Sequence, residues 1–240
     1  MKRLGLIVFS IAYWTVAFFW MGFLAVATIL ASGVFGYPRV HRWIPAPGFY
    51  GCVRMGFVRM KITYDPAFDP WRLSVFCQNH VNFLDAHLAS SAIPHAFCGL
   101  MHAWQFHIPF YGWLMRVSKG IRVYPGKKNL ESLVVQARER KRIRMSILTF
   151  PEGGRTTTGK VREFRKGVFA MAREAGYPVV PISVRGAYAV NRKGSMLFHP
   201  FHTIEIHIGR QFETQGLDDS GLEALVREVQ EEVARYADAE

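Results

Sequence analysis

The stretch LSVFCQNHVNFLDAH, residues 73–87, runs from a short apolar segment into a turn that holds a histidine and an aspartate five positions apart. On an ideal helix, five residues turn about 500°, which would leave the side chains of His80 and Asp85 roughly 140° apart. The two side chains meet only if the backbone between them bends. Residues 73–77 are typical of a buried strand, so we expect the bend where that strand runs into the start of a helix.

Further short apolar or alternating segments along the chain are typical of strands, and helix-like stretches separate several of them. The expected strands are 73–77, 96–100, 120–124, 145–150, 177–184 and 202–209, and the expected helices are 102–118, 129–143, 164–175 and 219–237. This alternation predicts an α/β domain with a largely parallel sheet flanked by helices. Such domains place their chemistry in loops at the carboxyl ends of the strands.

The N-terminal part of the chain has a different composition. No charged residue occurs between Arg3 and Arg39, and the 35-residue interval Leu4–Pro38 is nearly all apolar. About 20 apolar residues span a bilayer, whereas the apolar core of a cleavable signal has about 7–15, so we expect a membrane-embedded helical element. Two arrangements remain open: a single tilted span, or a hairpin or shallow insertion broken near Gly22 or Gly33.

The next segment, residues 39–64, mixes arginines and a lysine with aromatic residues and methionine. That composition is typical of an amphipathic segment lying on a membrane surface. Its basic excess predicts the cytoplasmic face of the inner (cytoplasmic) membrane for the α/β domain. The turn-rich sequence YDPAFDP at 64–70 predicts a hinge, which divides the chain into an N-terminal anchor and amphipathic segment, 1–62, and a domain, 63–240.

Charge narrows the range of partners. The formal net charge is +12, and residues 127–166 hold twelve Lys or Arg against four Glu, whereas residues 213–240 hold nine acids against two Arg. A basic central segment suits a phosphate-bearing partner, which includes nucleic acid, an anionic membrane surface and a phosphorylated small molecule. Nucleic-acid binding would leave the apolar N-terminus unexplained, so we expect no nucleic-acid partner.

The cysteines and histidines indicate no metal site. The three cysteines are widely separated and show no CxxC spacing, and the nine histidines show no HExxH or other ligand motif. The spacing therefore predicts neither a disulfide framework nor a bound metal.

A second polar motif, FPEGGRTTTG at 150–159, follows the expected strand 145–150. Its glycines and threonines favour a turn that exposes backbone N–H groups beside Arg155, which suits a phosphate or an oxyanion. The alternative is a plain surface turn with an ion pair between Glu152 and Arg155.

Together, these motifs resemble those of the glycerolipid acyltransferase family, which includes the 1-acyl-sn-glycerol-3-phosphate acyltransferases. The family's Asn-His-x-Ser-x-x-Asp block corresponds to Asn79, His80, Asn82 and Asp85, and its Phe-Pro-Glu-Gly-Thr-Arg block to residues 150–155. The Phe-x-Lys-Gly block corresponds to Phe164, Lys166 and Gly167, and the Val-Pro block to Val180 and Pro181. The match covers about residues 72–186, with the blocks in the family's order.

The resemblance implies a glycerol-3-phosphate acyltransferase-like fold, with residues 63–240 as the acyltransferase domain. It implies transfer of a fatty acyl group from acyl-CoA or acyl carrier protein to the hydroxyl of a membrane lysophospholipid, giving phosphatidic acid when the acceptor is 1-acyl-sn-glycerol-3-phosphate. No cofactor is implied beyond the acyl donor. The alternatives are another lysolipid or amino-lipid acceptor, a membrane-associated thioesterase, and a non-catalytic membrane-binding protein.

The resemblance also implies the catalytic roles. His80 would be the general base that takes the proton from the acceptor hydroxyl, and Asp85 would hold the imidazole and stabilise the imidazolium. The acceptor's hydroxyl attacks the thioester itself, so no protein nucleophile is needed, and the sequence has no GxSxG elbow. Backbone donors near Gly153 or at the helix start after His80 would stabilise the oxyanion.

The remaining expected site residues bind substrate, and they are Asn79, Glu152, Gly153, Arg155 and Lys166. In the family, a second block ends on an arginine that resembles a ligand of the acceptor phosphate. Here the sequence KGIRVYPGKK, 119–128, has Pro125 and Gly126 near that point. The phosphate contact then falls to Arg122, Lys127 or Lys128, or the acceptor has a different head group.

Overall fold

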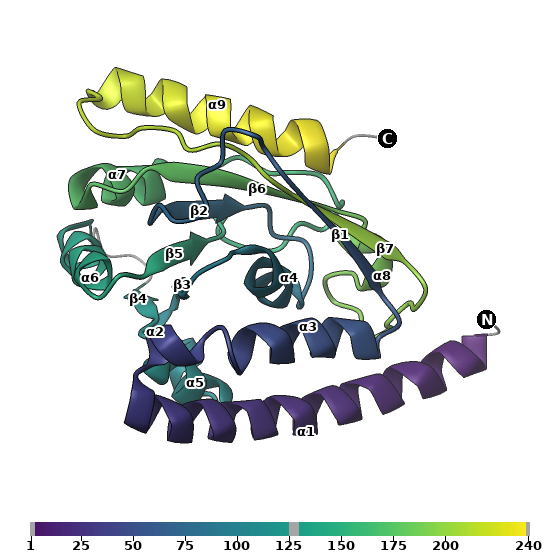
Figure 1. Cartoon of the computed structure of the whole chain (residues 1–240). Coiled ribbons are helices and arrows are strands. Elements are labelled where there is room, and N and C mark those ends of the chain that lie inside the picture. Colours follow the sequence, from purple (N-terminus) through teal and green to yellow (C-terminus); the bar gives the residue numbers. More distant parts are fainter. Residues whose placement is uncertain (1–2, 125–129, 239–240) are drawn as a thin grey trace.

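The computed structural model describes residues 3–124 and 130–238, and its described part contains a sheet with the strand order β1-β7-β6-β2-β5-β3-β4 (Figure 1). The strands are β1 Arg59–Tyr64, β2 Val75–Gln78, β3 Phe97–His102, β4 Ile121–Val123, β5 Ser146–Thr149, β6 Val179–Arg185 and β7 Thr203–Ile208. Neighbouring strands pair in parallel, except that β6 and β7 are antiparallel. The expected α/β class with a largely parallel sheet is confirmed.

Helices cover both faces of the sheet. Those of the described residues are α1 Arg3–Phe35, α2 Tyr37–Val40, α3 Pro45–Met55, α4 Asp85–Ala92, the 3-10 helix η1 Ala103–His107, α5 Tyr111–Val117, α6 Leu130–Arg142, α7 Lys166–Ala175, α8 Ala187–Val190 and α9 Asp219–Ala237. In Figure 1, α6, α7 and α9 lie on one side of the sheet, and α4, α3, α5 and α1 lie on the other.

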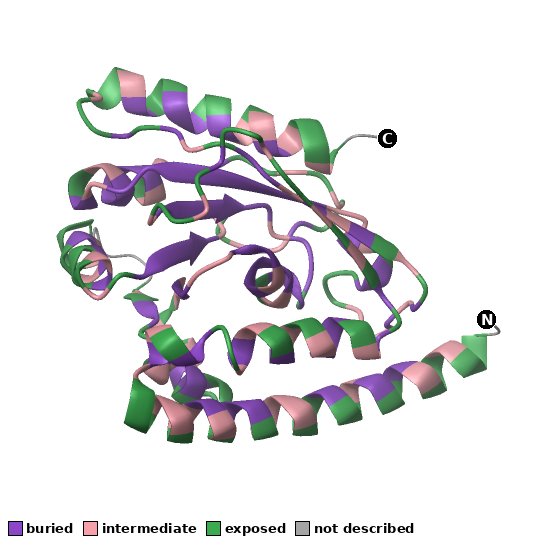
Figure 2. Cartoon of the chain, viewed as in Figure 1, coloured by how far each residue is buried: buried purple, intermediate pink, exposed green. Residues whose placement is uncertain are grey.

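The central strand β2 is buried on both faces, and all four of its residues are inaccessible (Figure 2). Val75 and Cys77 pack with residues of α6, α7 and α9, whereas Phe76, between them, packs with residues of α3 and α4. Burial on both faces explains why β2 is a continuous apolar run rather than an alternating one. The loop that follows β2 is therefore anchored in the middle of the core.

The region between the N-terminal helix and β2 differs from the expectation. Residues 39–64 do not form one surface-lying amphipathic segment, because they contain parts of α2, all of α3 and the edge strand β1. Cys52 and Val53 of α3 are buried in the same core cluster as Phe76. The expected boundary after residue 62 falls inside β1, which pairs with β7 along its whole length. In this segment, the exposed Arg59 and Lys61 alternate with residues that pack on the core. This pattern is typical of an edge strand as well as of a segment that lies on a membrane surface.

Helix α1 is continuous from Arg3 to Phe35, so the helix does not break at Gly22 or at Gly33, and the chain turns at Gly36 instead. It is the one helix among the described residues that is long and apolar enough to cross a membrane. One side packs along the domain, where the Tyr13 and Phe198 rings lie 3.8 Å apart between centroids and Trp20 Nε1 donates to the Gly48 carbonyl. Its other side exposes large apolar residues, so the helix is part of the core on one side only.

Candidate active site

The loops after β2 and β5 lie side by side at the carboxyl edge of the sheet, because these two strands are parallel neighbours. The Thr156 N–H of the second loop donates to the His80 carbonyl of the first at 2.8 Å. The two motifs, about 65 residues apart in sequence, therefore form one site.

The backbone after β2 bends as expected, and it brings His80 to Asp85. Asp85 is the first residue of α4, and its Oδ2 accepts hydrogen bonds from His80 Nδ1 at 2.7 Å and from the N–H groups of Val81 at 2.6 Å and Asn82 at 2.9 Å. One carboxylate oxygen thus holds both the imidazole and the turn that presents it. Asn82 supports the same turn, since its side-chain oxygen accepts from the Leu84 N–H.

The environment of the pair leaves one imidazole nitrogen for chemistry. The Asp85 side chain is 1% exposed and that of His80 is 24% exposed. With Nδ1 donating to Asp85, the lone pair of the neutral ring is on Nε2. The Phe150 ring stacks on the imidazole at 4.1 Å between centroids, which fixes the ring plane. The geometry is that of a histidine oriented by a buried carboxylate.

Glu152 holds the same loop through a hydrogen bond to its backbone. Its Oε1 accepts from the His80 N–H at 2.9 Å, while Oε2 is buried and has no hydrogen-bond partner within the described part of the chain. Burial raises the pKa of this carboxyl to about 7, although the His80 N–H and the charge of Arg162 act in the opposite direction. Near neutral pH, the Glu152 side chain is therefore a mixture of the protonated acid and the carboxylate.

Replacing Glu152 with glutamine should change how stability depends on pH. Between the unfolded pKa of 4.5 and the folded pKa of about 7, the unfolded chain ionises while the folded chain stays protonated, so wild-type stability falls as pH rises. Glutamine does not titrate. The free energy of unfolding of the variant relative to wild type should therefore rise by about 3 kcal/mol across this window and level off above it. Chemical unfolding in detergent at several pH values measures this, and parallel curves would mean that Glu152 is ionised in the folded protein.

Arg155 does not form the expected alternative, an ion pair with Glu152, within the described residues. Its guanidinium lies over the Phe83 ring at 4.0 Å, and Nη1 is buried without a hydrogen-bond partner in the described part of the chain. Phe83 in turn makes an edge contact with Trp14 of α1, at 6.0 Å between centroids. An arginine with an unused, buried donor thus lies against the His80 loop, whose Phe83 also contacts the apolar helix.

Two expected substrate ligands have structural contacts instead. The Asn79 side chain donates to the Val184 carbonyl at 2.9 Å and accepts from the Val184 N–H at 2.8 Å, which ties the β2 loop to β6. The Gly153 N–H donates to the Phe150 carbonyl at 3.0 Å and is not free for an oxyanion. Gly153 has φ +73°, and a Cβ there would lie 2.4 Å from the Arg165 guanidinium carbon, so this position requires glycine.

The other expected phosphate ligands are not gathered at His80. Arg122 lies on β4, three strands away from β2 in the sheet, or about 14 Å at the usual strand spacing, and its guanidinium packs on the Phe106 ring at 4.8 Å. Lys127 and Lys128 lie outside the described residues. Lys166 begins α7 and pairs with Glu223 of α9 at 2.9 Å.

Residue spacing alone missed the parts played by Phe150, Phe83 and Trp14. Phe150 and Phe83 are apolar residues inside polar turns, which is the signal that marks them, because a turn rarely retains an exposed aromatic ring without a partner. Trp14 carries no local signal, since its contact with Phe83 crosses some seventy residues. Among the described residues, no group of three or more His, Cys, Asp or Glu is placed to hold a metal ion, and Cys52, Cys77 and Cys98 are buried free thiols.

Comparison with known proteins agrees with this geometry. The acyltransferase family model matches residues 72–185, which contain both motifs. Just under half of the chain is thus similar to the acyltransferase family. This chain is 30% identical over 125 residues to 1-acyl-sn-glycerol-3-phosphate acyltransferase BAT2, chloroplastic, of Brassica napus, a match that covers 50% of this chain and 35% of that protein.

Two further matches extend beyond the family region. The chain is 24% identical over 190 residues to 1-acyl-sn-glycerol-3-phosphate acyltransferase of Saccharomyces cerevisiae, covering 73% of this chain and 62% of that protein. It shares its fold with the crystal structure of the 1-acyl-sn-glycerophosphate (LPA) acyltransferase PlsC from Thermotoga maritima, with a TM-score of 0.81, 20% identity and coverage of 99% of this chain and 98% of that one. The matched part of this chain spans less than two thirds of each of these curated relatives.

Proposed function

We propose that this protein transfers a fatty acyl group from an acyl thioester, acyl-CoA or acyl carrier protein, to the hydroxyl of a lysophospholipid. The acceptor that the site suits best is 1-acyl-sn-glycerol-3-phosphate, which gives phosphatidic acid. The observation that carries the proposal is the His80–Asp85 pair, 2.7 Å apart, one loop away from an arginine with an unused donor. The relatives, which are 1-acyl-sn-glycerol-3-phosphate acyltransferases by name, support the same acceptor.

In this proposal, His80 is the general base. Nε2 takes the proton of the acceptor hydroxyl as its oxygen bonds to the thioester carbonyl carbon. The resulting imidazolium is stabilised by the Asp85 carboxylate. When the tetrahedral intermediate collapses, the carbon–sulfur bond breaks and the leaving thiolate takes this proton from Nε2. Proton and acyl group are both accounted for without a protein nucleophile or a cofactor.

Backbone donors for the oxyanion are sought in the two loops, near Gly153 and at the helix start after His80. The N–H groups of His80, Val81, Asn82, Leu84, Gly153 and Thr156 all donate to other groups of the two loops. Several other N–H groups of the two loops donate to no described residue, those of Gly154 and Arg155 among them. We assign the oxyanion to these two, which directly follow Gly153, because fixed, unused donors stabilise developing charge without reorganisation.

Membrane attachment follows from the outer side of α1. This side exposes twelve large apolar residues, Leu4, Ile7, Val8, Ile11, Val16, Phe18, Phe19, Phe23, Val26, Leu30, Val34 and Phe35. Because the inner side packs on the domain along the helix, we propose that α1 inserts along the membrane surface rather than leaving the domain to cross it. The exposed Arg39, Arg42 and Arg54 that follow would contact anionic head groups, which suits the cytoplasmic face of the inner membrane.

The test of the reaction is acyl transfer by purified protein across a panel of lysolipids, with mass spectrometry of the products. A phospholipid product that requires the lysolipid supports the proposal. Release of free fatty acid at the same rate with and without lysolipid would make the protein a thioesterase. Preference for a lysolipid without phosphate would replace the proposed acceptor by another class.

Substituting Arg155 with lysine should raise KM for lysophosphatidic acid and leave KM for the acyl donor nearly unchanged. Lysine keeps the charge but loses both the stacking on Phe83 and the two parallel N–H groups that hold a phosphate. The expected loss is about 1–3 kcal/mol, or about 5- to 150-fold in acceptor KM. Steady-state kinetics with each substrate varied in turn measure it.

The matched control for this change is Arg210→Lys. Arg210 also stacks on an aromatic ring, Phe212, at 4.3 Å, but it follows β7, whose carboxyl end lies at the opposite edge of the sheet because β7 is antiparallel to β6. The Arg210→Lys change should leave the KM for the acceptor and the KM for the donor as in wild type. If Arg155→Lys raises the donor KM instead, the arginine belongs to the donor site.

Polar substitutions on the outer side of α1 should weaken membrane binding. Deleting the helix would also uncover Phe198, which packs on Tyr13, so a triple Phe18→Ser, Phe19→Ser, Phe23→Ser change is the cleaner test. Three rings would be lost from the membrane, each contributing about 1.5–3 kcal/mol, so most of the protein should move from vesicle pellet to supernatant. The control is Trp71→Ser with Val135→Ser, two exposed apolar residues outside α1; equal loss in both variants would refute the assignment.

A further inference from the structure

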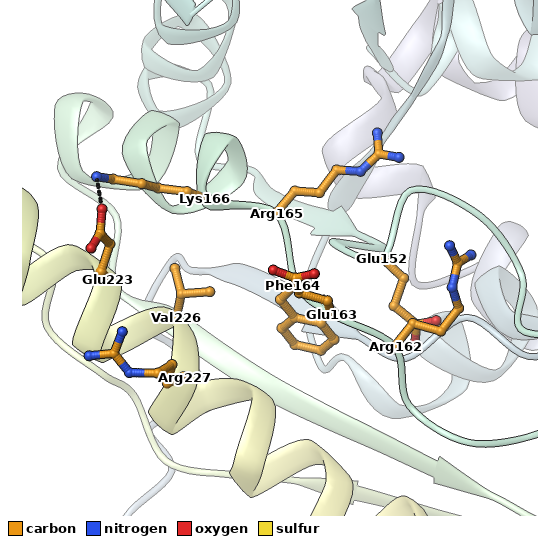
Figure 3. Close-up of a pocket in the computed structure, with 9 residues that line it drawn as sticks. All are labelled: Glu152, Arg162, Glu163, Phe164, Arg165, Lys166, Glu223, Val226 and Arg227. Atoms are coloured by element: carbon orange, nitrogen blue, oxygen red, sulfur yellow. Dashed lines mark hydrogen bonds and ion pairs between the residues drawn. The ribbon is translucent and has the colours of Figure 1, made fainter.

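A cavity lined by four cations and three glutamates lies beside the active site, between α7 and α9, and we call it the α7–α9 cavity. It has a volume of about 910 Å³ and is lined mainly by the segment that leads into α7 and by one side of α9. Figure 3 shows Arg162, Arg165 and Lys166 on the first wall and Arg227 on the second. The two helices that line it, α7 and α9, lie on the face of the sheet opposite to α1 (Figure 1). A ligand would therefore reach it from water and not from the membrane.

The cations of the cavity are only partly neutralised by the protein. Lys166 is paired with Glu223 at 2.9 Å, and Arg162 donates to the Gly154 carbonyl at 3.3 Å. The guanidinium groups of Arg165 and Arg227 form no hydrogen bond or ion pair with residues 3–124 or 130–238. Two guanidinium groups on opposite walls are thus available to an anion, and guanidinium is well matched to phosphate oxygens.

The first turn of α7 adds donors of the same kind. This ten-residue helix begins at Lys166, and no side chain caps its first N–H groups. No atom lies within 4 Å of the space that a Cβ on Gly167 would occupy, so a ligand can approach the helix start closely. Uncapped N–H groups at a helix start attract an anion through their orientation and the helix dipole.

The cavity is connected to the reacting groups through Glu152. This residue lines the cavity, is 2% exposed, and keeps its Oε2 buried and without a hydrogen-bond partner among the described residues. Its Oε1 accepts from the His80 N–H at 2.9 Å. The Arg165 guanidinium also lies against Gly153 of the same loop. One side chain thus separates the cavity from the catalytic histidine.

We propose that the α7–α9 cavity binds the phosphates of the acyl donor as coenzyme A, an inference that rests on the proposed acyl transfer. The phosphates and the thioester sulfur lie at opposite ends of a flexible pantetheine arm, so phosphates held in the cavity leave the thioester free to reach His80. The volume suits a nucleotide-sized ligand. An acidic carrier protein fits this face less well, because α9 itself holds five acids against two arginines.

Substitution of Arg227 by glutamine tests the proposal by kinetics. The matched control is Arg235→Gln, the same change on the same helix, at a residue that pairs with Glu232 outside the cavity. We expect Arg227→Gln to raise KM for a long-chain acyl-CoA about 5- to 20-fold and the double change with Arg165→Gln to raise it further. The acceptor KM, and kcat/KM with an acyl-pantetheine donor that has no phosphate, should match wild type.

Three outcomes of the kinetics would overturn the proposal. A rise in the acceptor KM would make the cavity part of the acceptor site. A loss confined to acyl carrier protein as donor would make α9 a protein-docking surface. An equal rise of the acyl-CoA KM in Arg235→Gln would mean that the loss of any positive charge on α9 has this effect, whether or not the residue lines the cavity.

Direct binding separates this proposal from the proposed function. Coenzyme A is titrated into the full-length protein in detergent by calorimetry, with wild type, Arg227→Gln and Arg235→Gln compared. Weaker binding in Arg227→Gln alone supports the cavity even if no acyl transfer is found, in which case only the proposed function fails. Equal affinity for coenzyme A in all three proteins, with normal acyl transfer, would refute coenzyme A binding in the cavity and leave the proposed function intact.

Discussion

Replacing His80 with alanine is expected to lower kcat for acyl transfer by about 10²–10⁴-fold, which corresponds to a barrier higher by about 3–5 kcal/mol. The base that removes the acceptor proton is lost, while Asp85 still holds the turn through the N–H groups of Val81 and Asn82. Membrane binding and thermal stability should therefore stay close to wild type. Single-turnover acyl transfer together with vesicle sedimentation measures both properties.

The control for this substitution is His107→Ala, which removes an exposed histidine at the end of η1. It should leave kcat unchanged. Near wild-type turnover by His80→Ala would refute the general-base mechanism, because no other described histidine is hydrogen-bonded to a buried carboxylate.

Changing Asp85 to asparagine should lower kcat by a similar factor, about 10²–10⁴-fold, without unfolding the protein. An asparagine oxygen can still accept the two backbone N–H groups of the turn, but it is neutral and does not stabilise an imidazolium. Its amide can also impose the tautomer that places the proton on Nε2, where the acceptor needs a lone pair. The measurement is kcat at saturating substrates beside the melting temperature of the same sample.

Asp65→Asn is the matched control, because Asp65 also accepts a backbone N–H, that of Ala67, in an exposed turn away from the site. If Asp85→Asn lost stability in proportion to activity, the carboxylate would be a structural element of the turn. If it retained most of its activity with normal stability, His80 would act without charge stabilisation from Asp85.

The alternation of short apolar strands with helices was enough to predict the α/β class, since burial on one or both faces leaves a periodicity in the residues themselves. The expected strands 73–77, 145–150 and 202–209 lie within one or two residues of β2, β5 and β7, and the expected helix 219–237 coincides with α9. The strand β1 was missed because its alternating cations and apolar residues also suit a membrane surface. Only pairing with β7 distinguishes the two, and pairing partners are distant in sequence.

In the site too, the sequence predicted the local contact, and the tertiary structure decided the contacts between distant segments. The HxxxxD and FPEG motifs, met in the family's order, were enough to place His80 and Asp85 in one turn, because that contact is local. What surrounds them was decided by the tertiary structure: Asn79 is occupied by Val184, Arg155 stacks on Phe83, and Glu152 joins the His80 loop to the α7–α9 cavity. Each of these contacts depends on how strands and helices far apart in the chain pack together. Local sequence patterns record the backbone's periodicity and turns, whereas burial and the choice of hydrogen-bond partners arise only when those elements meet.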